Sequence, residues 1–109
     1  MNIKLFETNR GDRPVEKFVR DTDPAATAKI MRQIDLLEHY GPKLSLPHAK
    51  KITSQLYELR IRGRQEVRIL YAFVGRGIVL LHAFYKKRQK LPGKDIKVAE
   101  ARFKQLTTL

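Results

Sequence analysis

The sequence predicts an α+β fold in which helices pack against an antiparallel β-sheet. Within residues 56–90, two breaks that contain glycine separate three apolar runs of strand length, which is typical of a three-strand meander. Two stretches before this region and one after it carry apolar residues at helical spacing. The expected order is therefore a strand, two helices, three strands and a C-terminal helix.

Residues 2–7 are expected to add a short strand to this sheet. Ile3 and Leu5 alternate there with polar neighbours, and a Gly-Asp-Arg-Pro segment at 11–14 ends the pattern. This N-terminal part contains no apolar run of signal-peptide length, and no run in the chain approaches a membrane span. A cytoplasmic location is the resulting expectation.

Start signals precede both helices of the first half. Asp12 can cap a helix whose first turn contains Pro14, and Asp23 and Pro24 form a clearer cap for the second helix. Tyr40, followed by Gly and Pro, ends this second helix. Each helix has an apolar stripe that it must bury. The stripe consists of Val15, Phe18 and Val19 in the first helix, and of Ala26, Ile30, Met31, Ile34 and Leu37 in the second.

Two further stretches complete the predicted order. Residues 43–54 have mixed polarity, a proline and no period, so we expect a loop there. After the Leu-Pro-Gly break at 91–93, residues 94–106 place a stripe on one helical face, made of Ile96, Ala99, Phe103 and Leu106. This final helix is expected to pack beside the sheet.

Alternation predicts the register of the first two meander strands. Tyr57, Leu59 and Ile61 alternate with charged residues, so a one-residue slip would turn the apolar set to the wrong face. A three-residue turn at Gly63 places Ile61 opposite Val67 and Arg60 opposite Arg68, whereas a two-residue turn pairs apolar with charged positions. We expect one face of the sheet to belong to the core and the other to carry arginines.

Length and composition limit the class of protein. With 109 residues the chain is expected to form one domain, residues 1–109, with a single modest core. It contains no cysteine, which excludes disulfides, thiolate catalysis and cysteine-bound zinc. His39, His48 and His82 lack the paired spacing of a metal site, so we expect neither a metal nor a cofactor. His82 is interpreted mainly as a satisfied sheet residue and only secondarily as a proton-transfer group.

The positive charge is concentrated in the half that contains the meander. Residues 51–109 hold 14 Lys and Arg against 4 Asp and Glu, and they supply most of the net charge of +12. Such a field favours nucleic acid, an anionic membrane surface or an acidic protein as a partner. Membrane binding is disfavoured, because the apolar faces are committed to a core.

The expected Arg60–Arg68 pair is the first candidate site. Like charges directly across two strands destabilise a sheet by a fraction of a kcal/mol up to about 1 kcal/mol. An anionic ligand, most simply a phosphate held by both guanidinium groups, would account for the pair. An equally favoured alternative is that the arginines extend into water or form ion pairs with Glu58 and Glu66.

A run of cations follows the third meander strand. A run of this kind is more often solvated surface than a site, but here it would lie near the two arginines if the third strand returns beside the second. Phosphodiester cleavage in RNA then needs no metal, because the 2′-hydroxyl is the nucleophile and arginines stabilise the phosphorane. Lys86 and Lys87 are candidate acid and base, because neighbouring cations favour the neutral amine. Candidate contacts to RNA are Glu58, which is also an alternative base, Arg62, Arg64, Tyr85, which could stack on a base, Arg88 and Lys90.

Three segments in this order resemble the phage-derived, HigB-like branch of the RelE/ParE toxin superfamily. They are LYELRI at 56–61, VRILYAF at 67–73 and IVLLHAFYKKRQKLP at 78–92. The resemblance implies a RelE-like fold and a toxin that cleaves mRNA, usually on the ribosome, with basic residues and no metal. It also implies a cognate helix-turn-helix antitoxin. The matching catalytic positions are Arg60, Arg68, Lys86 and Lys87.

The chain departs from the family pattern at two positions. Arg88 and Leu91 stand where members commonly have threonine, so one charge is gained and two hydroxyls are lost. Two alternatives to the nuclease hypothesis stay open: a non-catalytic toxin that binds DNA gyrase, as in the ParE branch, and a plain RNA- or ribosome-binding module. The paired arginines and the two lysines favour the nuclease.

Overall fold

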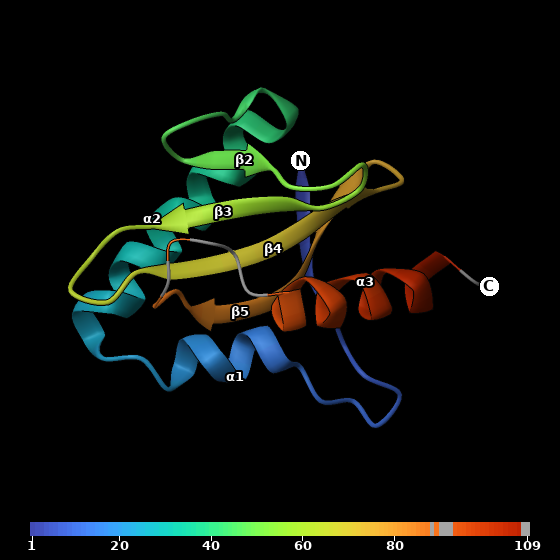
Figure 1. Ribbon diagram of the computed structural model, residues 1–109, viewed down its shortest axis with the longest axis horizontal. Helices are drawn as coiled ribbons and strands as arrows, with labels where there is room; N and C mark the ends of the chain where they lie inside the picture. The colour runs from blue at the N-terminus through green and yellow to red at the C-terminus, as the bar shows by residue number, and fades with distance from the viewer. Residues whose placement is uncertain (88, 90–92, 108–109) are drawn as a thin grey trace.

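A five-stranded sheet organises the computed structural model, which describes residues 1–87, 89 and 93–107 (Figure 1). The strands lie in the order β1-β5-β4-β3-β2. β3, β4 and β5 form the predicted antiparallel meander at the centre of the sheet. The strand bounds are β1 Asn2–Leu5, β2 Ala49–Lys51, β3 Tyr57–Ile61, β4 Val67–Val74 and β5 Gly77–Tyr85.

All three predicted helices are present. Asp23 caps α2, because its side chain accepts a hydrogen bond of 2.8 Å from the backbone N–H of Ala26, and Pro24 is the first helical residue. Asp12 does not cap α1, because the helix begins at Pro14 and the cap position therefore belongs to Arg13. The bounds are α1 Pro14–Arg20, α2 Pro24–Tyr40, a short 3₁₀ helix η1 Gly41–Lys43, and α3 Gly93–Thr107.

The meander has the predicted register. Ile61 lies opposite Val67, and Arg60 lies opposite Arg68. Between β4 and β5 the register shifts by one residue, because Leu70 pairs with His82 whereas Tyr71 pairs with Leu80. β5 therefore carries an extra residue at this bulge, which changes the side of the sheet that later β5 residues face.

Two sequence-based expectations about the sheet were wrong. β1 pairs with β5 in parallel, so the sheet is mixed and not wholly antiparallel. No tight turn joins these two strands, and the long connection between them, which contains α1, α2 and the strands β2 to β4, allows either direction. The predicted loop at 43–54 contains β2, which pairs with β3. This strand has only three residues, too few to show alternation.

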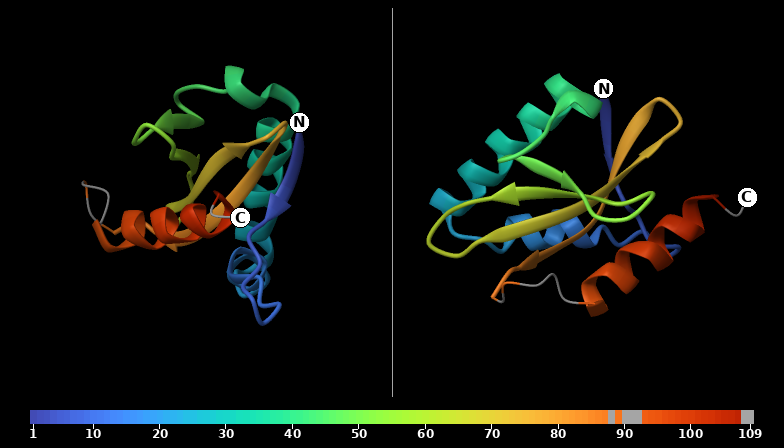
Figure 2. Two further views of the ribbon diagram at one scale, coloured as in Figure 1. Left: turned by 90° about the vertical axis from the view of Figure 1, so that its right-hand side faces the viewer. Right: turned by 45° about the horizontal axis from the view of Figure 1, so that its top comes forward.

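Both faces of the sheet contribute to the core (Figure 2). α1 and α2 cover one face, where Ile30 and Leu37 pack on Leu59 and Ile69. α3 covers part of the other face, where Ala99 belongs to the cluster that contains Leu70. This second face carries the expected arginines, Arg60 and Arg68, but it also holds an apolar cluster that the alternation did not predict.

The Tyr71 phenol should make stability depend on pH. Burial, and secondarily the nearby Tyr57 phenol, raises the pKa of Tyr71. Since an unfolded tyrosine titrates near about 10, the folded protein keeps this proton to higher pH. The stabilisation is complete below pH about 10 and is lost as the pH rises further. In urea titrations between roughly pH 8 and 11.5, the free energy of unfolding should fall more steeply for the wild type than for Tyr71→Phe; parallel curves would contradict this.

Candidate functional site

A buried carboxylate lies between the two paired arginines. Glu58 precedes Arg60 by two residues on β3 and therefore shares its face of the sheet. Glu58 Oε1 lies 2.8 Å from Arg60 Nε, and its Oε2 lies 3.5 Å from Arg68 Nε. Only 2% of the Glu58 side chain is exposed. The ion-pair alternative is thus the arrangement that the structure adopts, and Glu58 offsets the repulsion between the two cations.

Arg68 is the more deeply buried of the two arginines, with 5% of its side chain exposed against 23% for Arg60. Its guanidinium donates one hydrogen bond of 3.3 Å to the Val67 carbonyl and lies 3.6 Å from Glu66 Oε1. Its Nε is buried and has no hydrogen-bond partner within the described part of the chain. Arg68 is therefore a fixed interior charge, whereas Arg60 is accessible to a ligand.

The backbone carries Lys86 to the same side of the sheet. Its N–H donates a 2.8 Å hydrogen bond to the Glu66 carbonyl, which extends the pairing of β5 with β4 by one residue. Alternation then places Lys86 on the side of Arg68 and Phe84, which pair with each other. Lys86 is half-buried and Lys87 is exposed. The predicted contacts Arg88 and Lys90 lie outside the described residues.

The structure places Tyr85 on the opposite side of the sheet. Tyr85 pairs with Val67, which belongs to the core under α1 and α2, and its ring centroid lies 4.9 Å from that of Phe18. Tyr85, Arg62 and Arg64 all line a cleft of about 870 Å³ beside the β3–β4 turn. The predicted site residues thus lie on two sides of the sheet. Glu58, Arg60, Arg68 and Lys86 share one side, and Tyr85 lies on the other.

A polar cluster that the sequence analysis did not predict attaches α3 to β5. Asp95 Oδ1 lies 2.6 Å from His82 Nε2, and Arg102 donates a 2.7 Å hydrogen bond to the Leu81 carbonyl. Arg102 also lies 3.4 Å from His82 Nδ1, and since arginine only donates, the His82 proton belongs on Nε2. Burial lowers the pKa of Arg102. His82 is thus held at both nitrogens, in agreement with its interpretation as a satisfied sheet residue. The signal in the sequence that could have predicted this cluster is the pair Asp95 and Arg102, seven positions apart on one helix.

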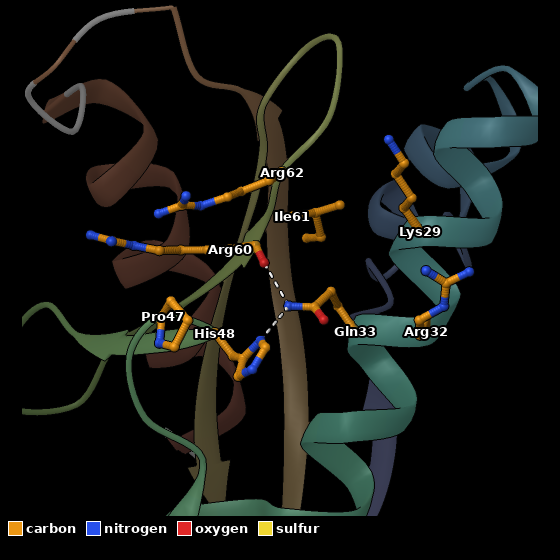
Figure 3. A pocket seen from close by; sticks show the side chains of 8 residues that line it. All are labelled: Lys29, Arg32, Gln33, Pro47, His48, Arg60, Ile61 and Arg62. Carbon is orange, nitrogen blue, oxygen red and sulfur yellow. Dashed lines mark hydrogen bonds between the residues drawn. The ribbon is translucent and has the colours of Figure 1, made fainter.

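A second missed group forms a pocket of about 300 Å³ at the edge of β3 (Figure 3). The Gln33 amide donates a 2.8 Å hydrogen bond to the Arg60 carbonyl and lies 3.3 Å from His48 Nδ1. The Arg60 N–H donates to the His48 carbonyl at 2.8 Å. The lining consists of Lys29, Arg32, Gln33, Pro47, His48, Arg60, Ile61 and Arg62. Four of these eight residues are cations and none is acidic.

The family of the chain follows from its sequence. A family described as phage-derived protein Gp49-like matches residues 17–104, which include every candidate site residue. The chain belongs to this family. It is a RelE-like toxin family, so this Gp49-like chain is a toxin-like module, and its α+β architecture is consistent with a RelE-like fold. No curated protein matches the chain.

The described residues of the Gp49-like chain contain neither a cluster of metal-ligand side chains nor a membrane-spanning helix. Within residues 1–87, 89 and 93–107, no three His, Asp or Glu side chains gather as ligands for a metal ion. Over the same residues, no helix has the length and apolar character needed to span a membrane.

Removing the Glu58 carboxylate should destabilise the Gp49-like fold. Glu58→Ala removes the buried partner of Arg68 and leaves it only the exposed Glu66, and breaking a buried pair in this way typically costs about 3–5 kcal/mol. Glu66→Ala is the matched control, because Glu66 pairs with the same arginine but is 45% exposed, and its loss should cost at most about 1 kcal/mol. Urea denaturation measures both values. Equal effects of the two substitutions would show that Glu58 does not hold the pair together.

Proposed function

We propose that this toxin-like chain is a metal-independent endoribonuclease that cleaves mRNA, most readily on the ribosome. The observation that carries the proposal is the pair of arginines held by one carboxylate on the same side of the sheet as Lys86. Membership of a RelE-like toxin family supports the toxin role. The charge excess of residues 51–109 suits a polyanionic substrate.

The proposed reaction uses the RNA 2′-hydroxyl as the nucleophile. Its oxygen attacks the adjacent phosphorus, the bond to the 5′ oxygen breaks, and the products are a 2′,3′-cyclic phosphate and a 5′-hydroxyl. Arg60, whose guanidinium is accessible, binds a non-bridging phosphate oxygen. The buried guanidinium of Arg68 stabilises the negative charge of the phosphorane from the protein interior. Because both guanidinium groups are held before the substrate arrives, little reorganisation is needed during the reaction.

Two protons have to move in this reaction. Both oxygens of Glu58 already face arginine nitrogens, so we assign Glu58 to positioning the guanidinium groups and not to proton transfer. Lys86 and Lys87 remain the proposed groups that remove the proton of the 2′-hydroxyl and supply one to the 5′ oxygen. Lys86 is the better placed of the two, because it lies on the side of Arg68.

The remaining proposed contacts concern RNA and protein partners. Arg62 and Arg64 are exposed at the β3–β4 turn and are proposed to contact RNA, together with Arg88 and Lys90. RNA would reach Tyr85 only by passing around this turn. Within the superfamily we place the chain in the HigB-like branch, acting in the cytoplasm with a cognate helix-turn-helix antitoxin as the toxin of a type II toxin–antitoxin pair.

A second candidate function is a non-catalytic toxin that binds DNA gyrase. The burial of Glu58 and Arg68 favours it, because ion pairs of this kind also occur as purely structural features of a core. Cleavage of mRNA separates the two candidates, since a gyrase-binding toxin leaves mRNA intact and damages DNA.

The cleavage site can be tested by expressing the wild type, Arg60→Ala and Arg68→Lys. Loss of the Arg60 donor should reduce mRNA cleavage on the order of 10²-fold, as for other donors to a developing oxyanion. Arg68→Lys keeps a cation beside Glu58, so the protein should fold, but it loses the planar fork and should also cleave poorly. Primer extension on a reporter mRNA gives the extent of cleavage, with growth as a second readout.

Arg76→Ala serves as the control, because Arg76 is an exposed arginine in the β4–β5 turn, and it should cleave like the wild type. Intact mRNA with an SOS response in wild-type cells would replace the nuclease with the gyrase-binding toxin. Intact mRNA with ribosome co-sedimentation would indicate a binding module without activity.

A further inference from the structure

Cations continue from the proposed cleavage site around the edge of β3 and onto α2. β2 pairs with β3 at residues 57–59 and the Arg60 N–H still bonds to the His48 carbonyl, so among the described residues no strand pairs with this edge of β3 from Ile61 onward. The pocket of about 300 Å³ lies at this edge, between β3, α2 and the segment that contains His48 (Figure 3). An extended ligand can therefore pass from one side of β3 to the other without crossing a strand.

Cationic residues of both β3 and α2 line this pocket. In Figure 3 the Arg60 and Arg62 side chains extend side by side from β3 away from α2, whereas Lys29 and Arg32 stand on α2 on the other side of the strand. Among the described residues, only Arg60 of these four has an ion-pair partner, which is Glu58. A Cβ at Gly63 would lie 3.4 Å from Lys29 Nζ, so this amine already lies close to the β3–β4 turn. Charges distributed on both sides of the β3 edge fit an extended polyanion better than one small anion.

His48 adds a neutral donor to the pocket. The Gln33 amide nitrogen can only donate, so His48 Nδ1 accepts from it and the imidazole proton belongs on Nε2. The same amide is fixed by its 2.8 Å hydrogen bond to the Arg60 carbonyl. An Nε2–H group is thus available to a phosphate oxygen. Within the described part of the chain, no Phe, Tyr or Trp lines the pocket, so the residues present suit backbone contacts and not base stacking.

We infer that this β3-edge track, defined as Lys29, Arg32, His48 and Arg62, binds the phosphodiester backbone of the single-stranded RNA that flanks the cleaved nucleotide. The inference rests on the proposed function for the identity of the polyanion. It assigns a role to α2 residues that the cleavage step does not use. Because the track contacts only phosphates, it holds RNA of any sequence and fixes the direction in which the strand leaves the cleavage site.

Binding is measured on the full chain with a 2′-O-methyl RNA oligonucleotide, which lacks the 2′-hydroxyl nucleophile and stays intact. Fluorescence anisotropy at several salt concentrations compares Lys29→Ala/Arg32→Ala with the control Arg76→Ala/Lys97→Ala. Each pair removes one lysine and one arginine that are exposed, so the net charge changes equally. Alanine suits the helix at 29 and 32, so the fold is retained.

The track variant should bind the RNA roughly tenfold more weakly near 0.15 M salt. The slope of its log binding constant against log salt concentration should be less steep by about 0.7 for each lost contact. The control should differ little from the wild type. In long-range ¹H–¹⁵N spectra, the RNA should shift the His48 side-chain signals and leave those of His39, which is exposed at the end of α2, unchanged.

Equal weakening in the two double variants would overturn the track, because general charge would then explain the binding. Unchanged His48 signals would likewise overturn the proposed contact with His48. If the wild type fails to cleave mRNA but the track variant alone loses binding, the nuclease proposal fails and the track stands. If cleavage occurs and both variants bind equally, the track fails and the nuclease stands.

Discussion

The Glu58 carboxylate allows two arginines to lie opposite each other in the centre of the site. Without it, Arg60 and Arg68 would repel across adjacent strands, and the buried Arg68 would keep only the exposed Glu66 as an anionic partner among the described residues. Each Glu58 oxygen serves one arginine. The contacts that allow Arg60 and Arg68 to lie opposite each other therefore also orient the two guanidinium groups.

The position of this charged group follows from how the helices cover the sheet. α1 and α2 bury one face, and α3 buries the other face over β4 and β5. Glu58 and Arg60 lie on β3, away from the two strands that α3 contacts most. The His82–Asp95–Arg102 cluster attaches α3 to β5 on the same face.

The sequence predicted those features that repeat along the chain. Alternation over β3 and β4 gave the Arg60–Arg68 register, and Asp23 with Pro24 gave the start of α2. Features that depend on distant residues could not be predicted in this way. His48 and Gln33 are 15 positions apart, and Arg102 reaches Leu81 over 21 positions. The burial of Arg68 depends on side-chain direction and on Glu66, which alternation alone does not describe.

The bulge in β5 decides which amine of the adjacent lysines faces the arginines. Ile78 and Leu80 face α1 and α2, and after the extra residue it is Ala83, not His82, that returns to this core. Strict alternation from Leu80 onward, without the bulge, would instead turn Lys87 to the side of the arginines and Lys86 to the opposite side. One irregularity in the pairing of β5 thus sets which of two adjacent amines lies beside Arg68.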